Sequence, residues 1–343
     1  MGGRMAGVRS GSSSGRRVSR RGCRVALLTA AVAVSLAAAG CTAGPDATGP
    51  GTEGDGRPPE PAQRSHSAAP AASGPVLAVK VDNVRDARPQ TGLEDADVVY
   101  AEPVEAGLSR LMGVYATKLP ESVGPVRSAR ESDLELLGQF DRPVLAFSGA
   151  QSKLLPLVDK APLRAEPADE DSGAWVREPD RRAPHNLYLH PGELLGKPSG
   201  AAALTTGFTY GKAPAGGREE SSLTVRYPSA RFTFTWSGSR DRWLVSMDGS
   251  PARTADGGRL APATVVVQHV KVRESQFRDF RGSNSPYVES VGSGRAEVLR
   301  DGRAYEATWK RGAAESGTTF TSDGGEPLNF ARGQVWVVFA GGS

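Results

Sequence analysis

Charged and amide side chains follow several short apolar segments between residues 80 and 130, where the chain reads KVDNVRDARPQTGLEDADVVYAEPVEAGLSRLMGVYATKLPESVGPVRSAR. Carboxylates can act as general acids or bases, and guanidinium groups bind phosphate and carboxylate anions. Burying so many polar groups costs free energy unless each finds a partner, so folding alone does not explain them. The sequence therefore predicts a polar site in this segment, without indicating which reaction, if any, occurs there.

The candidates for catalysis are three carboxylates and one histidine, namely Asp82, Glu102, Glu105 and His185. Strands over 97–102 and 108–116 would form a hairpin through a loop at 103–107, with Glu102 and Glu105 near its loop end. Clustered carboxylates can hold divalent cations or supply acid and base groups. The alternative is a purely structural network of ion pairs, and we expect neither a metal nor a cofactor.

Two of these candidates come from other segments of the chain. Asp82 ends a strand expected over 77–81 and could join the hairpin acids. His185 lies beside Asn186 in a polar loop, where a neutral imidazole could act as a general base. The alternative for His185 is a hydrogen-bonded anchor of that loop.

The segment GPVRSAR, residues 124–130, points to anion binding. Its glycine and proline predict a turn before a helix capped by Ser128 and Glu131, with Arg127 beside the free backbone N–H groups. In the alternative, Arg127 and Arg130 only pair with nearby carboxylates. The residues expected to bind a ligand carry amide, hydroxyl or guanidinium groups, and they are Asn83, Arg88, Arg110, Arg127, Ser128, Arg130 and Asn186.

The elements that position these residues change along the chain. After residue 130 the apolar spacing predicts a helix, then a strand over 144–148, a helix near 151–159 and an irregular loop over 161–182. A Gly-rich joint near 211–222 precedes a half dominated by strands. Those strands are expected over 232–236, 243–247, 264–272, 296–299, 305–309 and 334–339.

The first 40 residues read as a leader for export. Seven arginines and no acidic residue accompany an apolar run over 25–39, which is too short to span a bilayer comfortably. Leu36 to Cys41 resembles a bacterial lipobox, in which Cys41 becomes lipidated. An ordinary signal peptide is the alternative, and a twin-arginine route remains open beside general secretion. We expect a membrane-anchored protein on the outer face of the cell membrane.

Charge and cysteine content exclude several classes of protein. The chain has 42 basic and 38 acidic residues, and the leader holds seven of the basic ones, which leaves 35 against 38. A nucleic-acid partner is therefore not expected. Cys23 lies within the leader and Cys41 is the lipid site, so no disulfide is expected. The chain also lacks G-x-S-x-G, H-E-x-x-H and Walker motifs.

The motifs ARPQ-x-GL, E-x-G-x-x-R, GPVRSAR, APHN and LNFARGQVWVVF resemble those of the YerB-like lipoproteins, over roughly residues 75–343. The resemblance implies an exported, membrane-anchored protein of two parts, from a family without an established activity. It therefore indicates location better than function.

The expected fold class is α+β. A signal peptide over 1–40 and a disordered tether over 41–74 would precede an α/β-rich N-terminal domain over 75–212 and a β-rich antiparallel C-terminal domain over 220–343.

Three functions are compatible with this sequence. The first is binding of an anionic or phosphorylated envelope ligand by arginines at a polar cleft. The second is an envelope hydrolase or phosphotransferase that uses the clustered carboxylates and His185. The third is a scaffold that binds a protein partner at the membrane surface.

Overall fold

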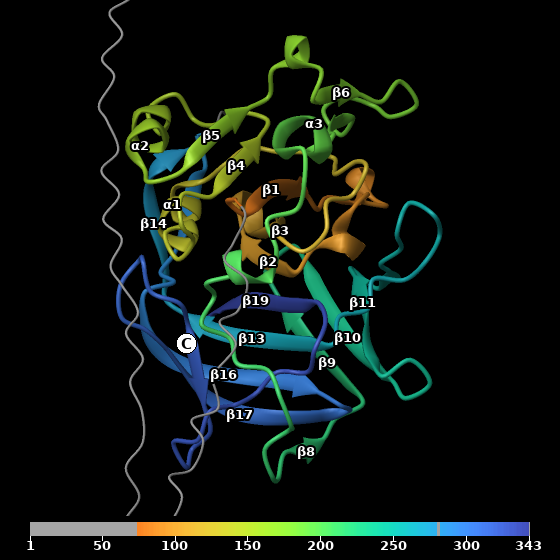
Figure 1. Cartoon of the computed structure of the whole chain (residues 1–343), viewed down its shortest axis with the longest axis vertical. Coiled ribbons are helices and arrows are strands. Elements are labelled where there is room, and N and C mark those ends of the chain that lie inside the picture. Colours follow the sequence, from red (N-terminus) through yellow and green to blue (C-terminus); the bar gives the residue numbers. More distant parts are fainter. Residues whose placement is uncertain (1–73, 280–281, 343) are drawn as a thin grey trace, which may run out of the picture. The chain divides into compact units, whose positions relative to one another are not determined.

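The computed structural model describes residues 74–279 and 282–342, so the leader, most of the tether and Cys41 lie outside the described residues. These described residues belong to one compact unit. Strands dominate this unit and helices are few and short (Figure 1). The expected α/β-rich character of the N-terminal half is not clearly present.

An eleven-stranded mixed sheet forms the centre of the fold, in the order β18-β17-β16-β13-β19-β2-β3-β1-β4-β5, with β8 paired to β17. Its strands are β1 (Leu77–Asp82), β2 (Val98–Pro103), β3 (Ser109–Tyr115), β4 (Val144–Phe147), β5 (Arg164–Pro167), β8 (Arg218–Glu219), β13 (Thr264–Val270), β16 (Gly292–Arg300), β17 (Arg303–Arg311), β18 (Thr319–Thr321) and β19 (Val335–Gly341).

The last strand of the chain joins the two halves of this sheet. β19 pairs in parallel with β13 on one side and with β2 on the other. The C-terminal half was expected to be antiparallel, and this expectation is wrong at β19. The boundary expected between 212 and 220 stays a prediction, but residues on either side of it share one sheet.

Smaller sheets accompany the central one, in the orders β12-β11-β10-β9, β14-β15 and β6-β7. Their strands are β6 (Trp175–Arg177), β7 (Leu187–Leu189), β9 (Ser222–Arg226), β10 (Arg231–Ser237), β11 (Arg242–Met247), β12 (Ser250–Pro251), β14 (Val272–Arg278) and β15 (Asn284–Val288). Strand β5 of the central sheet and strand β6 of the β6–β7 pair lie within the segment 161–182 that was expected to be irregular.

The helices are α1 (Glu131–Leu137), α2 (Leu155–Lys160) and α3 (Pro191–Leu195), and the 3₁₀ turns are Arg85–Ala87, Leu93–Asp95, Glu105–Gly107, Glu170–Ser172 and Ala201–Ala203. Helices this short are marginal alone and depend on packing against the sheet. Within residues 74–279 and 282–342, none is long and apolar enough to cross a membrane.

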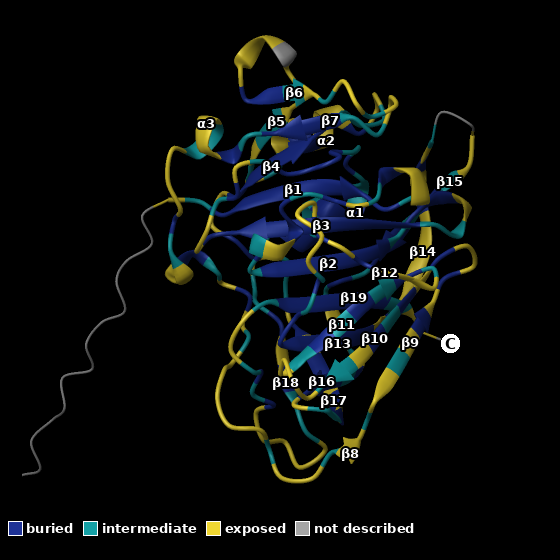
Figure 2. Cartoon of the chain, turned by 90° about the vertical axis from the view of Figure 1, so that its right-hand side faces the viewer, coloured by how far each residue is buried: buried dark blue, intermediate teal, exposed yellow. Residues whose placement is uncertain are grey.

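Apolar side chains cover both faces of the central sheet. On one face, Phe232 and Phe234 of β10 contact the ring of Trp336 from β19. On the other face, Leu136 and Leu137 of α1 join a second apolar cluster. The central strands are consequently buried, while the outer face of β9 and β10 is largely exposed (Figure 2).

Candidate functional site

Three charged residues form a row across neighbouring strands of the central sheet. Asp82 on β1 faces Arg110 on β3, and Arg110 faces Glu102 on β2. Side chains directly opposite each other in an antiparallel pair share one face of the sheet. The predicted hairpin and the placement of Asp82 beside it are therefore both present.

Asp82 is the hub of a buried ionic group. Its Oδ2 lies 2.9 Å from Arg127 Nε in an ion pair that is not aligned as a hydrogen bond. The same oxygen lies 2.8 Å from His185 Nδ1. Its Oδ1 accepts a hydrogen bond of 2.9 Å from the backbone N–H of Asn83 and lies 3.8 Å from Arg110 Nη2. One fully buried carboxylate thus serves two arginines and a histidine.

The Arg110 guanidinium is poorly compensated for a buried charge. Its side chain is 7% exposed, and its Nε is buried without a partner. Among the described residues none accepts a hydrogen bond from this side chain. Burial, and then the charge of Arg130, lower the pKa of Arg110 to about 10, against the opposing effect of Asp82. A buried, unsatisfied polar group of this kind needs an explanation.

Arg130 is engaged by Glu105. Its Nε and Nη2 donate to the two oxygens of Glu105 over 2.7 and 2.8 Å. Burial opposes ionisation of Glu105, but the hydrogen bonds and charge of Arg130, together with Ser285, lower its pKa to about 2. We call Arg110, Arg127 and Arg130 the arginine cluster. Arg110 and Arg127 both reach the carboxylate of Asp82, and the charge of Arg130 contributes to the lowered pKa of Arg110.

Glu102 belongs to a different ionic group. Lys80 Nζ lies 3.0 Å from Glu102 Oε2 and 2.8 Å from Asp133 Oδ1, and all three side chains are buried. The other oxygen of Glu102 is buried without a hydrogen bond, and burial, partly opposed by Lys80, raises the pKa of Glu102. Its ion pair with Lys80 and its burial make Glu102 a structural residue here, and the sequence did not indicate that Lys80 would join Glu102 to Asp133.

The segment 123–127 runs as an extended chain instead of a turn. It lies between β1 and β7, because Arg127 N–H donates to Lys80 O and Val126 N–H donates to Leu187 O. The predicted helix cap is wrong. Arg130 is the N-cap residue of α1, and its backbone N–H donates to Asp133 Oδ2 over 2.7 Å. Ser128 precedes that cap, and a helix this short offers no anion site at its N-terminus.

The remaining predicted ligand residues lie in two places. Asn83 donates to Ser109 Oγ, and Arg88 donates to both Asn83 and Asp248. Asn186 accepts a hydrogen bond from Arg177 within the β6–β7 pair, so it serves the loop that presents His185. Asn83 and Arg88 thus connect the end of β1 to the turn after β11. Asn186 belongs to the separate β6–β7 region.

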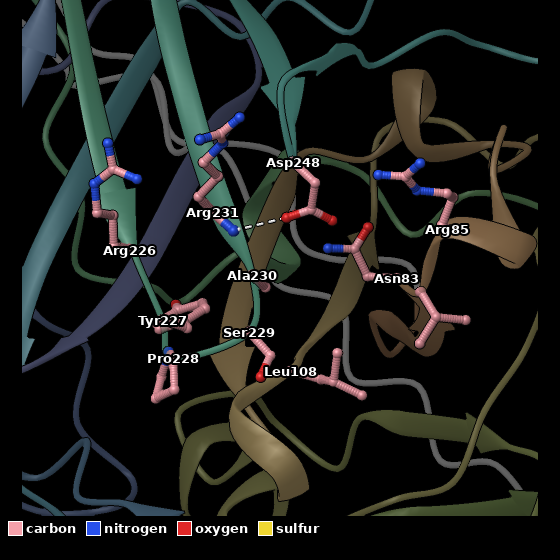
Figure 3. A pocket seen from close by; sticks show the side chains of 11 residues that line it. Asn83, Arg85, Leu108, Arg226, Tyr227, Pro228, Ser229, Ala230, Arg231 and Asp248 are labelled. Carbon is pink, nitrogen blue, oxygen red and sulfur yellow. Dashed lines mark hydrogen bonds between the residues drawn. The ribbon is translucent and has the colours of Figure 1, made fainter.

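Two polar cavities adjoin these groups. The first, of about 490 Å³, is lined by Ser128 and Arg130 together with Arg278 and Ser285, and we call it the Arg130 cavity. The second, of about 630 Å³, lies between Asn83, Arg85 and the β9–β10 hairpin (Figure 3). We call it the Arg231 cavity.

The catalytic candidates do not converge. His185 meets Asp82, whereas Glu102 binds Lys80 and Glu105 binds Arg130. In the part of the chain that the structure describes, no three His, Cys, Asp or Glu side chains are grouped to hold a metal ion. Exposed large apolar residues in that part are few and belong to three segments, and they are Leu155, Leu157, Tyr210 and Val272.

Comparison with known proteins agrees with the resemblance seen in the motifs. Residues 62–203 match the profile described as "Protein of unknown function (DUF3048) N-terminal domain", and residues 223–337 match that of its C-terminal domain. The chain is 24% identical over 277 residues to the protein named "Putative lipoprotein YerB" of Bacillus subtilis, covering 76% of this chain and 80% of that one. The crystal structure of B. subtilis YerB superposes with a TM-score of 0.64 at 21% identity, over 77% of this chain and 90% of that chain, which shows a shared fold.

Proposed function

The chain belongs to the DUF3048 family of proteins of unknown function, and we propose that it is an exported, membrane-anchored lipoprotein that binds an anionic ligand at the arginine cluster. The observation that carries this proposal is the state of Arg110. The Arg110 side chain is 7% exposed, makes no hydrogen bond among the described residues and lies 3.8 Å from its nearest carboxylate. Burying a guanidinium in this way costs free energy of folding. An oxyanion that accepts hydrogen bonds from Arg110 would remove this cost.

The local balance of charge supports an anion. Three guanidinium groups of the arginine cluster stand against two carboxylates, Asp82 and Glu105. Glu105 binds Arg130 through two hydrogen bonds, so Asp82 is the one carboxylate in the described part of the chain that forms an ion pair with Arg110 or Arg127. One positive charge is left over even when His185 is neutral. Guanidinium groups favour phosphate and carboxylate because the planar fork matches two oxygens at once.

Access is the second requirement. The Arg127 side chain is 26% exposed, so it stands at the rim where a ligand would arrive. Arg130 is the member of the cluster that lines the Arg130 cavity, whose volume suits a small ligand and whose lining also includes Glu105, Glu131 and Asp279. In this arrangement Arg127 and Arg110 bind the anionic group, while Asp82 and Glu105 hold the guanidiniums in place.

The proposed location rests on the leader and on a relative. The arginine-rich leader and the segment Leu36 to Cys41 are typical of bacterial lipoproteins. The B. subtilis relative is named a putative lipoprotein. We therefore propose that the folded part lies outside the cell membrane, anchored by lipid on Cys41.

A hydrolytic function is the second candidate because of His185. Its Nδ1 lies 2.8 Å from Asp82 Oδ2, so an Nδ1–H would donate to the carboxylate and leave Nε2 to accept a proton. However, only one of the three predicted carboxylates lies with this histidine. Release of inorganic phosphate from a phosphate monoester by the wild-type chain, but not by His185→Gln, would support this candidate. If the wild-type chain releases no phosphate, anion binding remains the proposed function.

Calorimetric titration of the full chain in a neutral detergent tests the binding proposal, with inorganic phosphate and citrate as probes. Arg127→Ala should weaken binding at least tenfold, since it removes the accessible guanidinium. Arg164→Ala is the matched control, because Arg164 Nε also lies 2.9 Å from a carboxylate oxygen, that of Glu166, at the far edge of the sheet. Equal affinity in wild type and Arg127→Ala, or no binding of either probe, would refute the proposal.

A further inference from the structure

The β9–β10 hairpin carries a pair of like charges that folding does not favour. Arg226 and Arg231 occupy directly opposite positions of this antiparallel pair. Both side chains are exposed, and Figure 3 shows them pointing the same way from neighbouring strands. Like charges directly opposite each other destabilise a sheet. The next pair on this face is Thr224 and Thr233, whose hydroxyls are hydrogen-bonded over 2.9 Å.

Neither arginine of this pair is neutralised. Across residues 74–279 and 282–342, no carboxylate forms an ion pair with Arg226 or Arg231. Asp248 is the one acidic residue that lines the Arg231 cavity. Its Oδ1 accepts a hydrogen bond from the backbone N–H of Arg231, and its Oδ2 pairs with Arg88 at 2.8 Å. The charge of Asp248 is therefore committed to Arg88.

A third guanidinium lines the same cavity from another element. Arg85, in the 3₁₀ turn after β1, stands beyond Asp248 and Asn83 from the hairpin (Figure 3). It also has no ion-pair partner in the described part of the chain. The cavity of about 630 Å³ thus holds three uncompensated positive charges from two walls. That volume is ordinary for a small-ligand pocket.

We infer that the Arg231 cavity is a second anion-binding site, for a ligand that carries two adjacent phosphate groups. Arg226 and Arg231 lie side by side and can each bind one phosphate through a planar fork. Arg85 faces them across the cavity and would bind the same ligand from the other wall. A ligand with a single charge would leave at least two of these guanidiniums uncompensated.

This site shares no residue with the arginine cluster, so the two sites can be tested separately. Pyrophosphate and orthophosphate would be titrated by calorimetry into the full chain carrying Arg127→Ala, so that binding at the arginine cluster is weakened at least tenfold. We expect saturable pyrophosphate binding at least tenfold tighter than orthophosphate binding. Adding Arg226→Ala or Arg231→Ala should each weaken pyrophosphate binding at least tenfold.

Arg242→Ala is the matched control. Arg242 lies on β11 of the same sheet, does not line the cavity and donates to the backbone oxygen of Asp241. Its loss should leave pyrophosphate affinity within twofold of the parent chain. Equal affinity for pyrophosphate and orthophosphate would overturn the inference, as would pyrophosphate binding that survives in the Arg226→Ala, Arg231→Ala double variant.

Discussion

Arg110 Nη2 and Asp82 Oδ1 lie 3.8 Å apart on residues that face each other across β3 and β1. This distance is long for a buried ion pair, because Asp82 turns its other oxygen toward Arg127 and His185. Asp82 interacts with all three side chains, and its contact with Arg110 is the longest of the three. The two residues therefore make unequal contributions to stability, and this difference can be measured.

Replacing Asp82 should destabilise the fold strongly. Asp82→Asn would leave Arg110 and Arg127 without a counter-charge, and breaking a buried pair costs about 3 kcal/mol or more. Arg110→Met keeps the volume and leaves Asp82 with three partners, so we expect a cost below about 1 kcal/mol. Urea denaturation of both variants measures the difference. A larger cost for Arg110→Met than for Asp82→Asn would contradict this account.

Lys80 should be indispensable for stability. It is fully buried between Glu102 and Asp133, so Lys80→Met would leave two buried carboxylates without a cation. We expect a loss of about 3–5 kcal/mol in the free energy of unfolding. Adding Glu102→Gln should recover part of this loss, since one unpaired charge disappears. A double-mutant cycle by urea denaturation checks both, and additive losses would disprove the coupling.

The ion pair between Glu105 and Arg130 predicts a loss of stability in acid. The pKa of Glu105 is lowered from 4.5 in the unfolded chain to about 2 in the fold. The stabilisation is therefore complete above about pH 4.5 and disappears as the pH falls toward 2. After allowance for solvent screening, we expect it to amount to about 2 kcal/mol.

Glu105→Gln should remove this part of the pH dependence, because glutamine does not titrate. Denaturation curves between pH 6 and 2 would show a shallower decline for the variant than for the wild-type chain. The control is Glu166→Gln, which removes a carboxylate paired with the more exposed Arg164. Parallel declines for wild type and Glu105→Gln would show that this ion pair does not determine acid stability.

Cys41 should determine where the protein is found. Cys41→Ser leaves the leader intact but removes the thiol that would carry lipid, so the exported chain should move from the membrane to the soluble fraction. Fractionation followed by immunoblotting measures this distribution, with the Cys23→Ser variant as control. A Cys41→Ser protein that stays with the membrane would refute lipid anchoring through this residue.

The sequence was informative wherever local pattern determines structure. The hairpin around Glu105 followed from two apolar segments and a short loop, and Asp248 and Gly249 both adopt positive φ, as is common for Asp-Gly in tight turns. The spacing of Leu77, Val79 and Val81 indicates a strand with one buried face, but β1 is buried on both faces because apolar layers from distant segments cover it. From the sequence Lys80 would face solvent, whereas in the fold its side chain is buried against the distant Asp133.

The candidate site was predicted in its residue types but not in its pairing. Asp82 and His185 are separated by 103 positions, and nothing in their local sequence indicates that they touch. Ser128 and Glu131 match a capping box, yet the helix begins two residues later because Arg127 N–H donates to Lys80 O and Ala129 N–H donates to Gly149 O. Arg226 and Arg231 were missed, although their equal distance from the centre of a hairpin turn was a usable signal.

The hairpin pair gives the last prediction, which concerns stability without any ligand. Arg231→Thr replaces one of two like charges with a residue that favours strands and would extend the threonine pair of the same face. The backbone N–H that donates to Asp248 is unaffected by this change. We expect the free energy of unfolding to rise by about 0.5 kcal/mol, while pyrophosphate binding falls. Thermal denaturation at low ionic strength measures the gain, which should shrink in high salt because the removed repulsion is screened. Arg242→Thr, on the neighbouring strand, should give no such salt-dependent gain, and a loss of stability in Arg231→Thr would show that the pair is not repulsive.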